Sequence, residues 1–305
     1  MVDATNFTAY FNGEWIPYGD VKISPDDRGF GLADVVFDIA RTFGGKPFVL
    51  DRHIDRLYRS LKYMRIDPGL SPQEMTDLCE EGVQLNMSRL GEVGDFTIHP
   101  WISRGTGSVT SGSEPTVCIG IKPVAFESFA RYYVEGDHGV IARTRSYSSD
   151  TMDPKVKHHN RANFVLAELE ASDVDPGASP ILLDQDGNLT EGTGYNVFLV
   201  KDGIIKTATD KSILQGISRS VIFEVAEQLG IPVFEEDLQP YDIYNADEVF
   251  FSRTSPRMIP VSMVDKRPIG DETPGPITKQ LLAAQSERVG VDIVGQALHF
   301  AGIEE

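Results

Sequence analysis

Two lysines and two adjacent histidines stand close together in residues 153–161 (DPKVKHHNR), just before a stretch with helical periodicity. A lysine at a helix start lies near the positive end of the helix dipole and near further cations. Both influences lower its pKa and favour the neutral amine that Schiff-base chemistry needs. Lys155 and Lys157 both fit this description. Consecutive histidine side chains point in different directions, so no shared metal ion is expected; the alternative is a solvated basic loop.

A single carboxylate, Glu191, lies between a glycine-rich turn and an apolar strand in residues 189–198 (LTEGTGYNVF). In this position a carboxylate can be buried and aimed at one partner. A buried, ionised carboxylate requires a cationic or hydrogen-bonding partner, and a protonated pyridine nitrogen would serve. The alternative is a hairpin with an exposed glutamate.

A candidate anion site follows in residues 214–219 (LQGISR), immediately before a helical pattern. Backbone N–H groups at a helix start, together with the Ser218 hydroxyl, can hold an anion. The run 252–256 (SRTSP) ends a predicted strand, and its hydroxyls on Thr254 and Ser255 could complete the site. The alternative for residues 214–219 is a simple helix cap.

A second candidate for anion binding is Arg56, which stands beside an apolar helix face in residues 51–57 (DRHIDRL). A guanidinium at the edge of such a face can bind a phosphate through two parallel hydrogen bonds. The alternative is an exposed helix arginine paired with a neighbour such as Asp51 or Asp55.

Composition excludes several classes of protein. The 305 residues include 28 Lys and Arg against 46 Asp and Glu, a net charge of −18, which repels phosphate backbones and argues against nucleic-acid binding. Residues 1–20 lack the pattern of a signal peptide, and no run of about 18 apolar residues predicts a membrane span. The two cysteines form no disulfide framework or metal motif, so we expect a cytoplasmic protein with no bound metal.

The first half of the chain alternates strands and helices. Residues 35–50 predict two strands joined at Gly44-Gly45. Asp51 is the expected N-cap of a helix whose apolar face repeats at three- and four-residue spacing. A second helix is expected over 72–87. Further strands are expected over 96–103 and 116–124.

Residues 125–138 show no clean period, and we interpret them as an interdomain connection. The expected organisation is a small domain over 1–125, a loop over 126–138 and a larger domain over 139–305. The second half again mixes both kinds of element, so the predicted class is α+β with two domains. Its expected elements are helices at about 160–171, at 217–229 and after Pro276, and strands near 140–147, 181–184, 232–235, 247–252 and 258–264.

Taken together and in order, these segments resemble the fold-type IV pyridoxal-phosphate enzymes, the class IV aminotransferases. The most specific parts are LTEGTGYNVFLVKDG at 189–203 and ILQGISRSVI at 213–222, within a match running from about residue 11 to 277. That group includes branched-chain aminotransferases, D-amino-acid aminotransferases, (R)-selective amine transaminases and aminodeoxychorismate lyases. The resemblance implies a small N-terminal α/β domain, a larger barrel-like C-terminal domain and a homodimer.

The resemblance also implies roles for individual residues. Lys157, rather than Lys155, matches the Schiff-base lysine and is followed at the expected place by Asn160. Glu191 matches the carboxylate that pairs with the ring nitrogen of pyridoxal 5'-phosphate. Arg56 matches a phosphate-binding arginine.

Four further residues match cofactor contacts of the family. Leu214 would pack on the ring, Ile217 and Ser218 would offer backbone N–H groups to the phosphate, and Thr254 would add a hydroxyl. The implied reaction moves a proton between the donor carbon and the cofactor, with the freed lysine amine as the general base and the cofactor ring accepting electrons.

The substrate pocket departs from the better-known family patterns. Phe37 matches a pocket aromatic, but His99 stands where branched-chain enzymes carry an arginine before a proline, and Arg161 replaces a common aromatic. Phe37, His99 and Ser255 are the expected substrate-binding residues. Three arginines are candidates for holding a substrate carboxylate, and the sequence does not choose among Arg41, Arg104 and Arg257.

The leading hypothesis is therefore a transaminase that moves an amino group between an amino acid or primary amine and a 2-keto acid, with branched-chain-like and (R)-amine-selective activity both open. The alternative is a lyase on the same scaffold, similar to aminodeoxychorismate lyase. A binding protein with an inactive site is disfavoured because Lys157 and Glu191 are both present.

Overall fold

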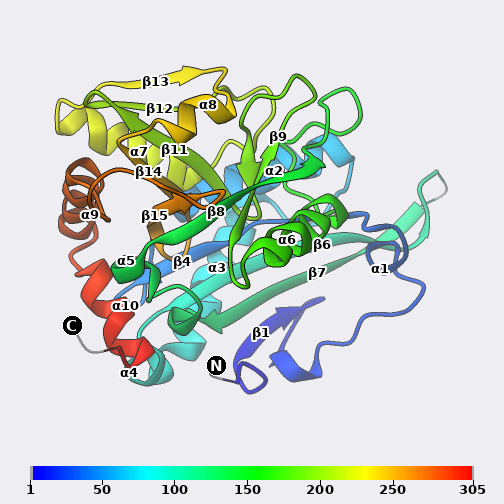
Figure 1. Cartoon of the computed structure of the whole chain (residues 1–305). Coiled ribbons are helices and arrows are strands. Elements are labelled where there is room, and N and C mark those ends of the chain that lie inside the picture. Colours follow the sequence, from blue (N-terminus) through cyan, green and yellow to red (C-terminus); the bar gives the residue numbers. More distant parts are fainter. Residues whose placement is uncertain (1–2, 111, 304–305) are drawn as a thin grey trace. The chain divides into compact units, whose positions relative to one another are not determined.

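The computed structural model describes residues 3–110 and 112–303. Its contacts divide the chain into two compact units (Figure 1). Unit 1 consists of Met1–Ala125 and Val156–Asn160, and unit 2 of Phe126–Lys155 and Arg161–Glu305. Both units combine a sheet with helices, as the predicted α+β class requires.

Unit 1 is built on a seven-stranded sheet in the order β2-β1-β7-β6-β4-β5, with β3 paired to β6. The predicted turn at Gly44-Gly45 is confirmed: it joins β4 to β5, and both glycines have positive φ, as the tight turn demands. The region before it holds two short strands rather than one. The bounds are β1 (Thr8–Phe11), β2 (Glu14–Pro17), β3 (Val35–Phe37), β4 (Ala40–Phe43), β5 (Lys46–Pro47), β6 (Phe96–Ser108) and β7 (Gly112–Pro123).

Two helices, α2 (Leu50–Met64) and α3 (Pro72–Asn86), pack on each other and on unit 1 strands. The predicted apolar face of α2 is confirmed, because Ile54, Leu57 and Leu61 are all buried in the core of unit 1. The expected N-cap was wrong by two residues. Val49, in the left-handed conformation, caps the helix, and Asp51 lies in its first turn, where its charge suits the helix dipole. A short helix, α4 (Leu90–Val93), follows α3.

The opposite side of this sheet carries a smaller cluster made of Val35, Phe37, Trp101 and Cys118. These residues alternate along their strands with those that face α2 and α3, as the period of two in a β-strand requires. The chain between β2 and β3 contains a 3-10 turn (Tyr18–Asp20) and the helix α1 (Arg28–Leu32), which packs on β6.

Residues 156–160 return to unit 1 and lie along β3. His158 forms a bridge with Val36, the Phe37 N–H donates to the Lys157 carbonyl at 3.0 Å, and the His159 N–H donates to the Val35 carbonyl at 3.1 Å. This segment therefore acts as a short extra strand whose sequence lies far from its neighbours.

Unit 2 contains a nine-stranded sheet in the order β13-β12-β11-β14-β15-β8-β9, with β10 on β11 and β16 on β15. It is mixed, because β8 runs parallel to both β9 and β15, and β12 parallel to β13. The bounds are β8 (Asp137–Arg145), β9 (Ser179–Leu183), β10 (Glu191–Gly192), β11 (Tyr195–Lys201), β12 (Ile204–Ala208), β13 (Val233–Glu236), β14 (Glu248–Arg253), β15 (Arg257–Val264) and β16 (Arg267–Pro268).

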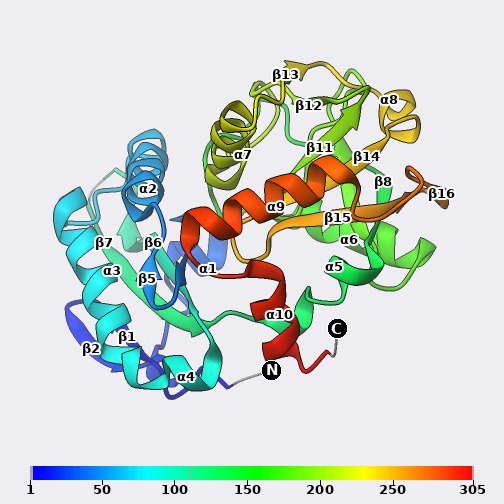
Figure 2. The ribbon, with the colours of Figure 1, turned by 90° about the vertical axis from the view of Figure 1, so that its left-hand side faces the viewer.

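Helices cover the sheet of unit 2. Helices α7 and α9 pack on each other and on β14, and α6 packs on β8 and β9 (Figure 2). The predicted helices are present, although the first begins at Ala162 rather than near residue 160. The bounds are α5 (Tyr132–Glu135), α6 (Ala162–Val174), α7 (Ile217–Gln228), α8 (Pro240–Tyr244), α9 (Pro276–Val289) and α10 (Ile293–Ala301).

The region expected to be a linker, 126–138, has structure of its own. It holds a 3-10 turn and α5, and Phe126 stacks on Phe300 of unit 2 with ring centroids 5.4 Å apart. The division into domains 1–125 and 139–305 with a loop over 126–138 remains a prediction. Across the described residues, no helix combines the length and apolar character that crossing a membrane requires.

Helix α3 begins with a reciprocal cap that can be tested. The Ser71 hydroxyl accepts from the Glu74 N–H, and the Glu74 carboxylate accepts from the Ser71 N–H. Ser71→Ala should lower the free energy of unfolding by about 1 kcal/mol, measured by urea denaturation. Gln73→Ala, at an exposed position of the same helix, is the control and should change it by less than about 0.5 kcal/mol. Equal effects of both substitutions would show that the cap contributes nothing.

Candidate active site

Lys157 is buried, with 8% of its surface exposed, and is held through its backbone. Its N–H donates to the Ser60 hydroxyl on α2 at 3.1 Å, and its carbonyl accepts from Phe37. The Lys157 ammonium nitrogen lies 4.6 Å from the centroid of the Phe37 ring. Lys155, the other candidate, has 36% of its side chain exposed and pairs with Asp153 at 3.3 Å. Burial and positioning therefore distinguish the two lysines and favour Lys157.

Arg56 is buried rather than exposed, and its partner is neither Asp51 nor Asp55. Its Nε and Nη2 donate to the two carboxylate oxygens of Asp38, both at 2.8 Å. From the sequence, Arg56 was expected either to bind a phosphate or to pair with a neighbour on the helix surface. The structure shows a buried, two-point ion pair with a residue at the end of β3.

The same carboxylate also contacts His53, whose Nδ1 lies 2.7 Å from Asp38 Oδ1. Burial by itself would raise the pKa of Asp38, but the charges of Arg56 and His53 and their hydrogen bonds together lower it below its usual value. Asp38 is therefore ionised throughout the neutral range, and α2 is tied to β3 by two of its side chains.

Ser60 connects this ion pair to Lys157. Its hydroxyl donates to the Arg56 carbonyl one turn earlier on α2 and accepts from the Lys157 N–H. Asp38 fixes Arg56, α2 carries Ser60, and Ser60 fixes the backbone of the lysine. The position of the amine thus depends on elements from three distant parts of the sequence.

In unit 2, Glu191 is buried and hydrogen-bonded, which excludes the exposed hairpin glutamate considered from the sequence. Its Oε2 accepts from the Leu214 N–H at 3.0 Å and from Asn196 Nδ2 at 3.4 Å. Asn196 Nδ2 also donates to the Leu214 carbonyl at 3.0 Å. Asn196 therefore joins two residues predicted from separate motifs, Glu191 and Leu214.

The start of α7 is suited to an anion. Gly216 at its N-cap offers no side-chain cap, so the first N–H groups of the helix depend on another acceptor. A Cβ on Gly216 would collide with Asn196 Oδ1, so only glycine fits here. The Ser218 hydroxyl donates to the Arg253 carbonyl at 2.9 Å and accepts from Arg257 Nη1 at 3.1 Å.

Arg257 therefore brings a buried positive charge to the start of α7. It follows the turn that holds Thr254 and Ser255, and its backbone has a φ of 66°, an uncommon conformation for a residue with a side chain. An uncapped helix start, a hydroxyl and a guanidinium on one side of unit 2 form a chemically suitable phosphate site. These residues fit the phosphate of the cofactor that the family uses.

The other two arginine candidates are engaged in structural contacts. Arg104 makes a two-point ion pair with Asp34, at 2.7 and 3.1 Å. Arg41 is 2% exposed, donates to the Thr42 carbonyl and stacks over Phe43. The proposal that either arginine holds a substrate carboxylate gains no support from these contacts.

Phe37 and His99 lie together on one side of the unit 1 sheet, with ring centroids 5.6 Å apart, and His159 lies 4.6 Å from Phe37. Burial is the main cause that lowers the pKa of His99, to about 3, and the nearby positive charge of Lys122 adds to it. His99 is therefore neutral at physiological pH, unlike the arginine of branched-chain enzymes.

Three residues that are hydrogen-bonded to the expected site residues, directly or through one another, were not predicted from the sequence: Asp38, His53 and Asn196. Asp38 was hidden inside an apolar strand pattern, and His53 inside a helix. The available signal was the charged residue in VVFDIA, since an unpaired buried carboxylate is costly and implies a partner.

The comparisons identify the family. The family model described as amino-transferase class IV matches residues 35–264. The chain belongs to the class IV aminotransferase family, and the matches described below are named as aminotransferases, which does not favour the alternative of a lyase on the same scaffold.

Among the relatives, the putative branched-chain-amino-acid aminotransferase of Methanocaldococcus jannaschii is 38% identical over 277 residues, covering 89% of this chain and 93% of the relative. The D-alanine aminotransferase of Staphylococcus haemolyticus is 33% identical, covering 89% and 94%.

Solved structures agree with the sequence relatives. The Escherichia coli branched-chain amino acid aminotransferase has a TM-score of 0.84 at 28% identity and covers 93% of each chain. The putative branched-chain amino acid aminotransferase of Thermotoga maritima has a TM-score of 0.76 at 26% identity, covering 92% of this chain and 95% of that one. The predicted family and two-domain α+β class are confirmed.

Removing the charge of Asp38 should destabilise the protein strongly. Asp38→Asn leaves Arg56 buried without its counter-charge, and we expect a loss of about 3–5 kcal/mol in the free energy of unfolding at pH 7, measured by guanidinium denaturation. The matched control is Asp55→Asn on α2, the helix that carries Arg56. The Asp55 side chain is 69% exposed and pairs only at the surface, so its loss should cost less than about 1 kcal/mol.

The same pair predicts a dependence on pH. Because the pKa of Asp38 is lower in the folded state, its stabilising contribution is complete above the unfolded-state pKa of about 4 and is lost as the pH falls below it. Stability between pH 5 and 2 should therefore fall more steeply in the wild type than in Asp38→Asn. Parallel curves would contradict the assignment.

Proposed function

We propose that the chain is an aminotransferase that binds pyridoxal 5'-phosphate through Lys157 and transfers an amino group from an amino acid or primary amine to a 2-keto acid. The observation that carries this proposal is the burial of Lys157, held by Ser60 and Phe37 through its backbone while its amine lies against an aromatic ring. A buried amine of this kind loses solvation as an ammonium ion, which favours the nucleophilic neutral form.

Bound pyridoxal phosphate supplies an aldehyde that accepts the amino group and a ring that withdraws electrons from the donor carbon. Lys157 first provides the covalent attachment point. With the cofactor bound and an amino donor in its place, the amine of Lys157 would be the base that takes and holds the proton from the donor carbon. The ring of Phe37 beside the amine excludes water from one side and limits where the amine can point.

Glu191 is the proposed partner of the cofactor ring nitrogen. Its Oε2 accepts hydrogen bonds from the Leu214 N–H and from Asn196 Nδ2, and these hold the carboxylate in one orientation. An ionised carboxylate at this position would favour a proton on the ring nitrogen of the bound cofactor. Leu214 is proposed to pack on the ring.

The phosphate is proposed to bind at the start of α7, through the N–H groups of Ile217 and Ser218 and the hydroxyl of Thr254. Arg257 supports this proposal because it donates to the Ser218 hydroxyl and adds positive charge. Arg56 is retained as a proposed phosphate contact, with its charge partly balanced by Asp38.

The donor is proposed to contact Phe37, His99 and Ser255. Relatives include aminotransferases named for branched-chain amino acids and for D-alanine, so both donor classes belong in a first panel. Primary amines of (R) configuration belong there too, because (R)-selective amine transaminases belong to the group that the sequence resembles.

A cytoplasmic homodimer is the proposed state of the protein. Apolar side chains are exposed on α6 and α1, among them Leu166, Leu169 and Phe30, and a second copy of the chain would remove them from water. The two cysteines, Cys79 and Cys118, are buried thiols, as suits a reducing compartment.

Lys157→Ala tests the attachment point. The variant should lose the yellow colour of the lysine-bound cofactor and at least about 1,000-fold of the transamination rate, because both the attachment point and the base are gone. Lys155→Ala is the matched control in the same segment and should keep both. A wild-type protein that neither takes up pyridoxal phosphate nor transaminates any donor in the panel would overturn the proposed function.

Gly216→Ala tests the phosphate site. The added methyl group would collide with the Asn196 side chain that also bonds Glu191, so we expect at least a ten-fold increase in the dissociation constant for pyridoxal phosphate. The measurement is a titration of the apoenzyme followed by absorbance. Gly91→Ala, where no atom lies within 4 Å of the added methyl, should bind like the wild type. An unchanged constant for Gly216→Ala would place the phosphate elsewhere.

A further inference from the structure

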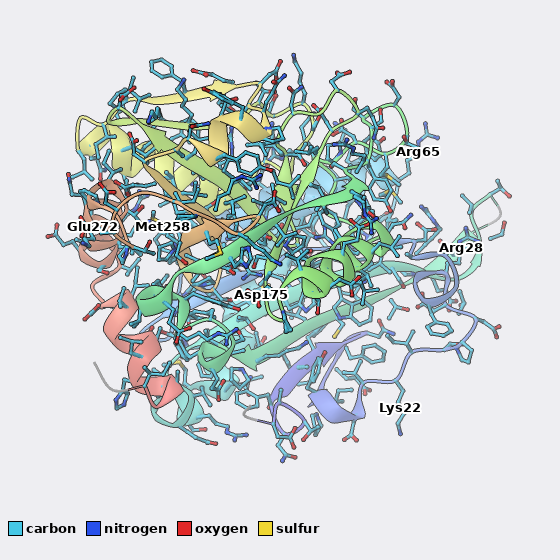
Figure 3. All side chains as sticks on the ribbon, viewed as in Figure 1. Lys22, Arg28, Arg65, Asp175, Met258 and Glu272 are labelled. Carbon is cyan, nitrogen blue, oxygen red and sulfur yellow. The ribbon has the colours of Figure 1, made fainter. Side chains whose placement is uncertain are left out.

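Unit 1 contains a cavity of about 440 Å³ that the family assignment leaves without a role. We call it the His99 cavity. Its volume lies within the range of small-molecule sites, roughly 300–1,000 Å³. The segment between β2 and α1 borders it. Of the residues labelled in Figure 3, Lys22 lies in that segment and Arg28 is the first residue of α1. Most of its wall is apolar, formed by Tyr18, Val21, Ile23, Phe30, Val35 and Trp101.

One wall of the cavity presents a polar group with an unused hydrogen-bonding capacity. The Nε2 atom of His99 is buried and has no hydrogen-bond partner among the residues that the structure describes. Leaving such an atom unsatisfied costs about 1–3 kcal/mol. Since His99 is neutral, it offers a ligand a hydrogen bond but no positive charge.

The cavity wall also carries a carboxylate, Asp27, which disfavours anionic ligands. Asp27 is buried, and its carboxylate accepts hydrogen bonds from the Gly29 N–H and from the hydroxyls of Ser103 and Thr116. These three donors hold it in place, and its charge repels any carboxylate that enters. A neutral histidine and a fixed aspartate together disfavour an acidic ligand.

The cavity lies close to the amine of Lys157. Phe37 contacts both: its ring centroid is 4.6 Å from the Lys157 ammonium nitrogen, and 4.6 Å and 5.6 Å from the rings of His159 and His99. His159 and His99 line the cavity. One aromatic ring therefore separates the reacting amine from the cavity.

We infer that the His99 cavity receives the side chain of the amino donor, and that the preferred side chain is a neutral aromatic or large apolar group rather than an acidic one. A hydroxyl at the far end of such a side chain bonds His99 Nε2. This inference rests on the proposed function, because it assigns a substrate class to the same reaction.

Occupancy of the cavity can be measured without the reaction. The chain has two tryptophans, and Trp101 lines the cavity while Trp15 packs on Tyr10. In a Trp15→Phe background, fluorescence therefore reports on Trp101. Titration with p-cresol, a neutral ring with one hydroxyl, should give a saturable change. Its carboxylate counterpart p-toluate should bind at least ten-fold more weakly. Equal binding of the two, or no change with p-cresol, would overturn the inference.

Filling the cavity should change which donors react. Val21→Phe places a ring in the space, and the ratio of kcat/KM for phenylalanine to that for alanine should fall at least ten-fold, measured with both enantiomers of each. Val134→Phe makes the same change at an exposed valine outside the cavity and should leave the ratio within two-fold. An unchanged ratio for Val21→Phe would exclude entry of the donor side chain.

The role of His99 itself has a separate readout. His99→Leu should reduce the preference for tyrosine over phenylalanine by about 3- to 10-fold in kcat/KM, since one hydrogen bond is lost. It should also weaken p-cresol binding to Trp15→Phe protein. A His99→Leu variant that keeps the full tyrosine preference would remove His99 from the site.

The experiments distinguish a failure of the proposed function from a failure of the role assigned to the His99 cavity. If p-cresol binds as expected but no donor transaminates, the cavity stands and the proposed function fails. If donors transaminate but p-cresol does not bind and Val21→Phe leaves the donor ratio unchanged, the proposed function stands and the assignment of the cavity fails.

Discussion

The buried ion pair between Asp38 and Arg56 is the constraint on which the arrangement of unit 1 depends. Two charges removed from water must satisfy each other closely, and the carboxylate does so through both oxygens while also binding His53. The pair fixes α2 against the end of β3. Ser60, one turn after Arg56, then holds the backbone of Lys157. This buried ion pair thus helps to position the backbone of Lys157, the proposed attachment point.

Residues 156–160 return to unit 1 and bring Lys157 next to α2 and β3. The segment pairs with β3 through backbone hydrogen bonds, which depend on little of the side-chain sequence. Its side chains are therefore available for other roles. The side chain of Lys157 is the proposed attachment point of the cofactor, and the side chain of His159 forms part of the wall of a cavity.

A strongly acidic protein that binds an anionic cofactor needs local positive potential, and unit 2 supplies it at the start of α7. The uncapped N–H groups, the Ser218 hydroxyl and Arg257 act over contact distances, where the net charge of −18 has little influence. In the part of the chain that the structure describes, the cavity of unit 1 has no comparable positive charge on its wall, which carries a neutral histidine and a hydrogen-bonded aspartate. One site suits a phosphate, and the other suits a neutral side chain.

The sequence by itself determined the family, the α+β class and most helices and strands, and it proposed Lys157 and Glu191 as site residues, because short motifs and hydrophobic periodicity are local properties of the chain. It placed the start of α2 two residues late, and its alternative interpretation of Arg56 as an exposed arginine paired with a helix neighbour was wrong. Only the tertiary structure decided that Asp38 pairs with Arg56, that Asn196 links Glu191 to Leu214, and that His99 lines a cavity. The Asp38–Arg56 and Asn196–Leu214 contacts each join residues 18 positions apart, and the cavity is lined by residues from several elements, so local spacing in the sequence does not show them.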